Sequence, residues 1–203
     1  MFYRAQENSA FANSQWEETT MYLQKVNASA HPCAHALGAL RSLTRDFVFV
    51  SQSDRTRFAA DGCIDVLRAA NTLIGKDAFK WGHMTASDLI STSKPCTARQ
   101  TLVLAGGIFD PWHVSKDELP HFRSTLRSAA RLCIIGSAIF VPLIASILKT
   151  QKTSVHPEFR AAVKEHGYLC DFHDDNTCHQ ASISSAVSPA SGIEMMVDLV
   201  GAI

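Results

Sequence analysis

The chain has 203 residues, 46% of them hydrophobic, and its 19 basic and 19 acidic side chains give a formal net charge of zero. This length suffices for one domain with a sizeable core and disfavours two small ones. A dedicated nucleic-acid binder normally carries a basic surplus, because contacts to phosphates supply most of its affinity, so the composition argues against direct binding to nucleic acid.

The N-terminal part of the chain differs in composition from the rest. It is polar at first and then weakly helical around MYLQKV and ALGALRSL. We expect residues 1–45 to form an appendage that packs on the core or on a partner subunit, and residues 46–203 to form one domain. The first residues lack the apolar segment of a signal peptide, which leaves secretion unsupported. The six cysteines are therefore expected to be reduced, mostly as small buried hydrophobes of a cytoplasmic protein.

Short apolar runs are typical of buried strands. Four stand out: FVFV (47–50), TLVLA (101–105), RLCII (131–135) and YLCDF (168–172). The first three are continuously apolar, as expected where helices cover both faces of a parallel sheet. The segment FKWGHMTA (79–86) predicts a further strand, and ISSAV (183–187) a weaker one.

Helical patterns separate these runs. Apolar residues recur at helical spacing over 57–75, where a glycine closes the pattern, and again over 116–131. Two more helices are predicted over 158–166 and 190–203. The alternation predicts an α/β domain with a doubly wound, mostly parallel sheet and helices on both faces. Ligands of such sheets bind at the carboxyl ends of the strands, near the point where the strand order reverses.

The apolar run LCIIGSAIFVPLIASIL (132–148) contains Gly136 and Pro142. It is marginal for a membrane span and better explained as a buried strand followed by a helix, so no membrane partner is expected. A strand, a tight corner and a helix form the layout with which many α/β enzymes expose a nucleophile. Here the corner residue is Gly136, and the nearest cysteine, Cys133, lies earlier, inside the strand.

Several segments together resemble one family. They are FVFV with IDVLRAANTLIG, FKWGHMTASDLISTSKPC, TLVLAGG, GSAIFVPLIASILKTQKTSVHPEF and SPASGIEMMVDLV. From residue 46 onward, their order is similar to that in the PfpI-like, glutamine-amidotransferase-like sensor domains of AraC-type transcriptional regulators. The resemblance implies a flavodoxin-like fold. It also implies that DNA is contacted only through a C-terminal helix-turn-helix domain, which is absent from this chain.

The departures from the family pattern bear on chemistry. Gly136 takes the position of the nucleophilic cysteine of the hydrolase and amidotransferase relatives, and glycine cannot form a covalent intermediate. Ser137 stands in place of the family's threonine, Ala138 in place of its glycine, and Glu194 in place of a common aspartate. The resemblance therefore implies a domain without catalytic residues, which senses a ligand and forms a homodimer.

The expected effector is a small metabolite, by family analogy an amine, an amino acid or a quaternary ammonium compound. Backbone N–H groups of the glycine turn and of the corner could hold a carboxylate, while an acidic or aromatic side chain could face a cation. His156 either contacts the ligand or hydrogen-bonds the backbone at a strand end. The candidate ligand-binding residues are Asp54, Gly106, Gly107, Ile108, Trp112, Gly136, Ser137, Ala138 and His156.

Two alternatives remain open. A hydrolase or amidotransferase-like enzyme could use Ser137 or a displaced cysteine such as Cys133, although a serine here also suits a helix cap or a ligand contact. A dimerising scaffold without any ligand is the third possibility.

No cofactor or metal site is expected. The spacing of Cys170, His173, Cys178 and His179 fits no zinc motif. His31, Cys33 and His35 form a similar coincidence beside Pro32.

Three arginines, Arg123, Arg127 and Arg131, recur at every fourth position. They could dock an acidic partner or DNA. Because they lie opposite an apolar stripe, we expect them to form the solvated face of an amphipathic helix.

Overall fold

The computed structural model describes residues 44–53, 56–91, 98–109, 111–148, 150–169 and 171–203. The chain divides into two compact units, Met1–Leu37 and Gly38–Ile203, and every described residue belongs to the second. The predicted appendage lies outside the described residues, apart from Thr44 and Arg45.

One six-stranded sheet forms the centre of this unit, with the strand order β2-β1-β3-β4-β6-β5. Its strands are β1 (Asp46–Ser51), β2 (Lys80–Thr85), β3 (Gln100–Ala105), β4 (Arg131–Ile135), β5 (Thr177–Gln180) and β6 (Ile183–Ala186). All neighbouring pairs are parallel except the β5–β6 hairpin. The chain passes from β1 outward to β2 and then returns to the other side of β1, so the strand order reverses between β1 and β3.

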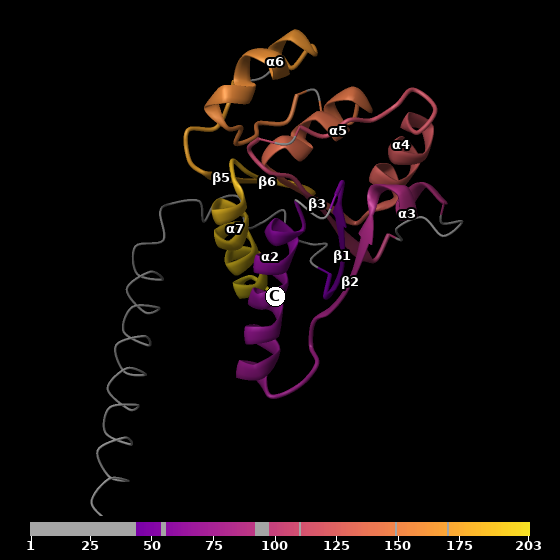
Figure 1. Cartoon of the computed structure of the whole chain (residues 1–203). Helices are drawn as coiled ribbons and strands as arrows, with labels where there is room; N and C mark the ends of the chain where they lie inside the picture. The colour runs from indigo at the N-terminus through magenta and orange to yellow at the C-terminus, as the bar shows by residue number, and fades with distance from the viewer. Residues whose placement is uncertain (1–43, 54–55, 92–97, 110, 149, 170) are drawn as a thin grey trace, which may run out of the picture. The chain divides into compact units, whose positions relative to one another are not determined.

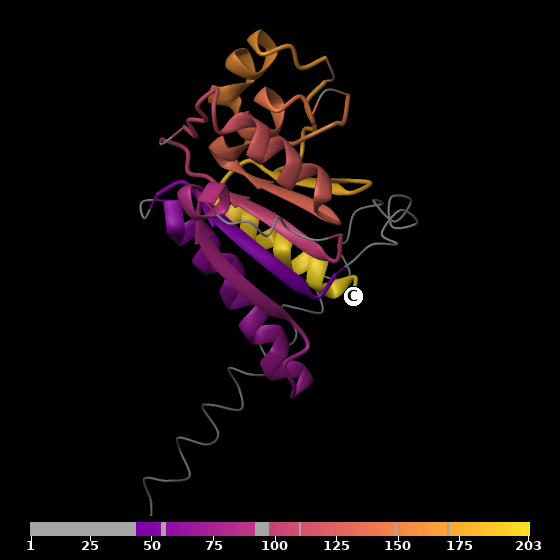
Figure 2. The ribbon, with the colours of Figure 1, turned by 90° about the vertical axis from the view of Figure 1, so that its right-hand side faces the viewer.

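Helices cover both faces of the sheet (Figures 1 and 2). One face carries α2 (Arg57–Ile74) and α7 (Pro189–Gly201), whose buried residues pack with Phe49, Val103 and Cys133. The opposite face carries α3 (Ala86–Ser91), α4 (Leu119–Ser128), α5 (Phe140–Ile144) and α6 (Arg160–Glu165). The predicted fold class, a doubly wound and mostly parallel α/β sheet, is confirmed.

Helix α2 follows the predicted pattern closely. Its buried residues include Cys63, Ile64 and Leu67, spaced so that one side of the helix faces the sheet. Gly75 ends it in the left-handed conformation, at φ 72°, and its N–H donates to the Asn71 carbonyl. Just before this cap, the Asn71 side chain bonds both backbone groups of Phe79, at 2.9 and 2.8 Å, and so ties the end of α2 to the start of β2.

The predicted strand over 168–172 is wrong. Its described residues lie in a loop, and the strand next along the chain is β5. The aromatic residues of the segment pack against each other instead: Tyr168 stacks on Phe172 with ring centroids 5.3 Å apart. The Tyr168 hydroxyl is 2.9 Å from Thr153 Oγ1 and donates to the Gln151 carbonyl, so the segment is held by side-chain contacts rather than by a strand ladder.

The prediction that Arg131 joins a solvated arginine stripe is also wrong. Helix α4 ends at Ser128, and Arg131 opens β4 with its side chain only 1% exposed. Its Nη1 donates to Ser184 Oγ at 3.1 Å and its Nη2 to the Ala181 carbonyl at 2.9 Å. Burial lowers the pKa of the guanidinium, and its Nε has no hydrogen-bond partner among the described residues.

This buried arginine belongs to a polar chain that reaches α7. Ser184 Oγ also lies 3.0 Å from His179 Nδ1, and His179 Nε2 lies 3.4 Å from Asp198 Oδ2 of α7. The guanidinium can only donate to Ser184, so the serine oxygen serves both as its acceptor and as the link to the imidazole. The Ser184 hydroxyl thus connects strands β4, β5 and β6, and the His179 ring lies close to Asp198 of α7 without a hydrogen bond at its Nε2 among the described residues.

None of the helices within the described ranges is both long and apolar enough to cross a membrane.

We predict that Ser184→Ala lowers the free energy of unfolding by about 1–3 kcal/mol, because it leaves a buried donor of Arg131 unpaired. In an Arg131→Met background the same substitution should cost less, since no buried cation is left without an acceptor. Urea denaturation followed by circular dichroism measures both. Ser182→Ala, at an exposed position beside β6, is the control. A Ser184→Ala variant as stable as the wild type would contradict the role given to this hydroxyl.

Candidate functional site

The loops that follow β1, β3 and β4 meet at the carboxyl edge of the sheet, beside the point where the strand order reverses. Gln52, Ser53 and Thr56 follow β1, a glycine pair follows β3, and a 3-10 helix (Gly136–Ile139) follows β4. This is the edge at which doubly wound sheets bind ligands. The structure therefore brings together two of the predicted groups of site residues, the Gly106–Ile108 turn and the Gly136–Ala138 corner.

The corner has the backbone conformation of a nucleophile elbow. Gly136 turns the chain directly out of β4 with φ at 55°, in the left-handed region that side-chain-bearing residues rarely adopt. The turn after β3 packs against it. The Gly106 N–H donates to the Ile135 carbonyl at 3.0 Å, and the Ser137 N–H donates to the Gly107 carbonyl at 2.9 Å.

These two glycine segments approach too closely for a side chain to stand between them. A Cβ on Gly136 would lie 2.7 Å from the Gly107 oxygen, and a Cβ on Gly106 would lie 2.4 Å from the Ala138 nitrogen. Ser137 and Ala138 are both 0% exposed. The corner is thus closed by backbone, and its serine hydroxyl is buried.

The thiols near the corner are poor nucleophiles. Cys133 is 0% exposed, and burial raises the pKa of its thiol from 9.0 to about 12, although Arg131 and Ser184 act in the opposite direction. Burial likewise raises the pKa of the Cys63 thiol on α2 to about 12. Because the thiolate is the reactive form, neither residue suits covalent catalysis near neutral pH.

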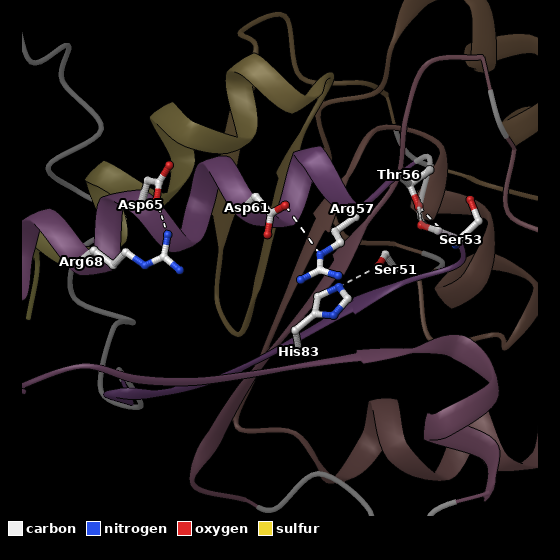
Figure 3. Close-up of polar contacts among 8 residues, drawn as sticks. All are labelled: Ser51, Ser53, Thr56, Arg57, Asp61, Asp65, Arg68 and His83. Atoms are coloured by element: carbon white, nitrogen blue, oxygen red, sulfur yellow. Dashed lines mark hydrogen bonds and ion pairs between the residues drawn. The ribbon is translucent and has the colours of Figure 1, made fainter.

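A polar rim surrounds the end of β1 (Figure 3). Ser51, which is 1% exposed, has its Oγ 2.8 Å from Nε2 of His83 on β2. The Thr56 hydroxyl donates to the Ser53 carbonyl at 3.0 Å and shapes the turn that leads into α2. Gln52 stands between Ser51 and Ser53 in the sequence, and its Nε2 donates to the His113 carbonyl at 3.3 Å.

Sequence reasoning missed this rim. The available signal was SQS, a run of polar residues directly after the continuously apolar strand FVFV. Polar side chains at the carboxyl end of a buried strand are well placed to meet a ligand.

The other predicted site residues lie in varied surroundings. Trp112 is 3% exposed, donates from Nε1 to the Ala105 carbonyl, and packs edge-on against Phe122. His156 precedes a 3-10 helix (Pro157–Phe159), where its Nδ1 accepts from the Glu158 N–H and its ring lies 5.7 Å from that of Phe159. Ile108 is half-buried beside the glycine turn. Asp54 lies outside the described residues.

The residues considered for zinc have separate partners. His173 Nδ1 lies 3.5 Å from Asp175, Cys178 donates to the Lys152 carbonyl, and His179 contacts Ser184. Cys170 lies outside the described residues. Within the described ranges, no three potential metal ligands gather at one point.

Solved structures share this fold. An AraC family transcriptional regulator from Pseudomonas putida is 21% identical, with a TM-score of 0.60 over 76% of this chain and 90% of that chain. A candidate transcriptional regulator from Vibrio parahaemolyticus is 17% identical, with a TM-score of 0.63 over 77% and 91%. A ThiJ/PfpI domain protein from Brachyspira murdochii is 14% identical, with a TM-score of 0.55 over 78% and 96%.

No family sequence model and no curated protein sequence matches the chain. The structural likenesses show that the described part of the chain has the PfpI-like, flavodoxin-like fold, and the resemblance stated from the sequence is confirmed at the level of fold.

Three glycine substitutions should distinguish the cost of a positive φ from the cost of a steric clash at the new Cβ. Gly75→Ala meets only a positive φ, with no atom within 4 Å of the new Cβ, and should cost about 1–2 kcal/mol of unfolding free energy. Gly82→Ala meets neither obstacle and should stay within about 1 kcal/mol of the wild type. Gly136→Ala meets both and should cost about 1–3 kcal/mol more than Gly75→Ala. Chemical denaturation measures all three, and equal costs at 75 and 136 would contradict the closed corner.

The two buried thiols should make stability fall at alkaline pH. In the folded protein they stay protonated up to about pH 12, whereas in the unfolded chain they ionise from about pH 9. Ionisation between these values therefore lowers the free energy of the unfolded state relative to the folded state. Between these values each thiol should lower the free energy of unfolding by up to about 1.4 kcal/mol per pH unit. Denaturation of the wild type and of a Cys63→Ala/Cys133→Ala variant across this range measures the difference. Identical pH profiles would contradict the prediction.

Proposed function

We propose that this domain is a non-catalytic, ligand-sensing and dimerising module of an AraC-type transcriptional regulator. The observation that carries the proposal is the corner at Gly136. It keeps the strand–corner–helix conformation in which related folds present a nucleophile, yet a carbonyl oxygen lies where a side chain would have to begin.

The names of two structural neighbours support a regulatory role. The protein from Pseudomonas putida is described as an AraC family transcriptional regulator and that from Vibrio parahaemolyticus as a candidate transcriptional regulator, and this chain covers 90% and 91% of their solved chains. The balanced charge of the sequence argues that DNA is not bound by this domain itself. DNA would be contacted through a separate helix-turn-helix module.

The effector would be a small metabolite bound over the carboxyl edge of the sheet. Gly106, Gly107 and the corner from Gly136 to Ala138 would form the floor, with Ile108 beside it and the polar rim after β1 along one side. Binding would change DNA affinity only if the effector favours one of two arrangements of a homodimer, since a ligand with equal affinity for both shifts nothing.

An enzyme using Ser137 or a displaced cysteine is the competing function. The geometry gives it little support, because Ser137 and Cys133 are both 0% exposed and the Cys133 thiol has a pKa of about 12. A reactive ester or an alkylating reagent, followed by mass spectrometry, tests it directly. A single hyper-reactive site at either residue would favour the enzyme.

The sensing function predicts that a metabolite from a broad panel raises the thermal midpoint of the wild-type protein. Ile108→Arg should abolish that shift by placing a bulky cation at the edge of the site. Leu73→Arg, at an exposed position near the far end of α2, should preserve it. Analytical ultracentrifugation of the same samples reports whether the protein is dimeric. If no metabolite stabilises the wild type, or if both variants respond equally, the proposed site is wrong.

A further inference from the structure

Gln52 is the residue of the polar rim that directly follows the last residue of β1. It lies next to the point where the strand order reverses, and in the sequence it stands between Ser51 and Ser53. Its side-chain nitrogen donates to the His113 carbonyl in the loop after β3, at 3.3 Å. This bond orients the carboxamide, with its nitrogen toward that loop and its oxygen away from it.

The carboxamide oxygen has been left without a donor. Oε1 of Gln52 is buried, and no hydrogen-bond donor of the described residues reaches it. Buried polar atoms in native proteins nearly always have a partner, and an unsatisfied one costs about 1–3 kcal/mol. Rotating the carboxamide by 180° gives no relief, because it would set two oxygens against each other at His113.

Nearby side chains already use their hydroxyl groups. Ser51 Oγ is paired with His83 Nε2, and the Thr56 hydroxyl donates to the Ser53 carbonyl. Among the described residues of the rim, the Gln52 oxygen is therefore the acceptor that the fold itself does not satisfy.

We propose that the Gln52 side chain turns toward the effector on binding and that its carboxamide oxygen, buried without ligand, then accepts a hydrogen bond from an N–H group of the effector. This rests on the proposed sensing function and narrows its ligand. Of the three expected classes, a primary or secondary amine and an amino acid can supply such a donor. A quaternary ammonium group has no N–H and cannot.

Three of the aromatic rings already have partners, whereas Phe109, directly after the glycine turn, is 91% exposed. A quaternary ammonium ion is best held by open ring faces. Trp112, the aromatic residue expected to face a cation, is 3% exposed and packs in the core. The rings of Tyr168 and Phe172 already lie under Lys164, with its Nζ 5.4 and 5.1 Å from their centroids, and Arg160 also lies over Phe172.

The test uses probes in which N–H groups are replaced one by one with N-methyl groups. Glycine, N-methylglycine, N,N-dimethylglycine and N,N,N-trimethylglycine share one carboxylate, while their N–H count falls to zero. Methylammonium and tetramethylammonium form a second series, and the metabolites that stabilise the wild type are compared with their permethylated forms. Thermal shift and titration calorimetry should give at least about tenfold weaker binding for each permethylated compound than for its N–H parent.

Substitutions at Gln52 assign the preference to this residue. Gln52→Met keeps the size of the side chain but removes the acceptor, so it should erase the difference between N–H and permethylated probes. Gln52→Glu keeps an acceptor and adds a charge, while it loses the donor to the His113 carbonyl, so it should favour ammonium ligands over neutral amides at some cost in stability. Gln180→Met, at an exposed position on β5, is the matched control and should behave as the wild type. Unfolding curves without ligand show that each variant is folded.

The outcomes are distinct. A permethylated probe that binds the wild type as tightly as its parent overturns the inference and leaves the sensing function standing. An N–H preference that survives in Gln52→Met also overturns it. If no metabolite or probe stabilises the wild type, the proposed function fails and the inference fails with it. A crystal structure with a stabilising ligand in which only water contacts Oε1 would likewise refute the assignment.

Discussion

The backbone contact between the Gly106–Gly107 turn and the Gly136 corner is the constraint on which this site depends. Two reciprocal hydrogen bonds join the turns after β3 and β4, and the peptide groups meet without any side chain between them. Because neighbouring parallel strands end at the same edge, this contact fixes how their following loops leave the sheet. The floor of the site is therefore made of backbone, whose polar groups largely bond to one another.

A floor made of backbone offers no side-chain nucleophile at this edge of the sheet. A nucleophile needs an exposed atom on a side chain, whereas here the corner offers neither a Cβ nor an accessible hydroxyl. If the domain binds an effector as proposed, its side-chain contacts would come from the rim, where Ser51, Gln52 and His83 lie at the end of β1 and beside it. The corner thus keeps the strand–corner–helix layout, while the polar side chains at this edge lie at the end of β1, with β3 between β1 and β4.

The sequence predicted the parts whose local pattern matches their burial. The apolar runs within strands β1, β3 and β4 are buried as predicted, and α2 ends at its predicted glycine. Strand β5 was not predicted, because its sequence TCHQ is polar and the strand lies at the edge of the sheet. The tyrosine and phenylalanine of YLCDF suggested a β-strand, but in the structure their rings stack on each other. Arg131 is polar in sequence yet buried, because its acceptors come from β6 and the hairpin turn. The closure of the corner by Gly107 is equally non-local, so no pattern around Gly136 could reveal it.

The buried arginine also bears on how the domain is made. Arg131 finds its acceptors 53 and 50 residues further along the chain. While a nascent chain still lacks the β5–β6 hairpin, that guanidinium has only water to bond, and β4 cannot be covered on the α2 side without burying a bare charge. The sheet is therefore completed late, when hairpin and final helix arrive together. A chain truncated before β5 would not be a smaller domain but an incompletely folded one, open to proteolysis.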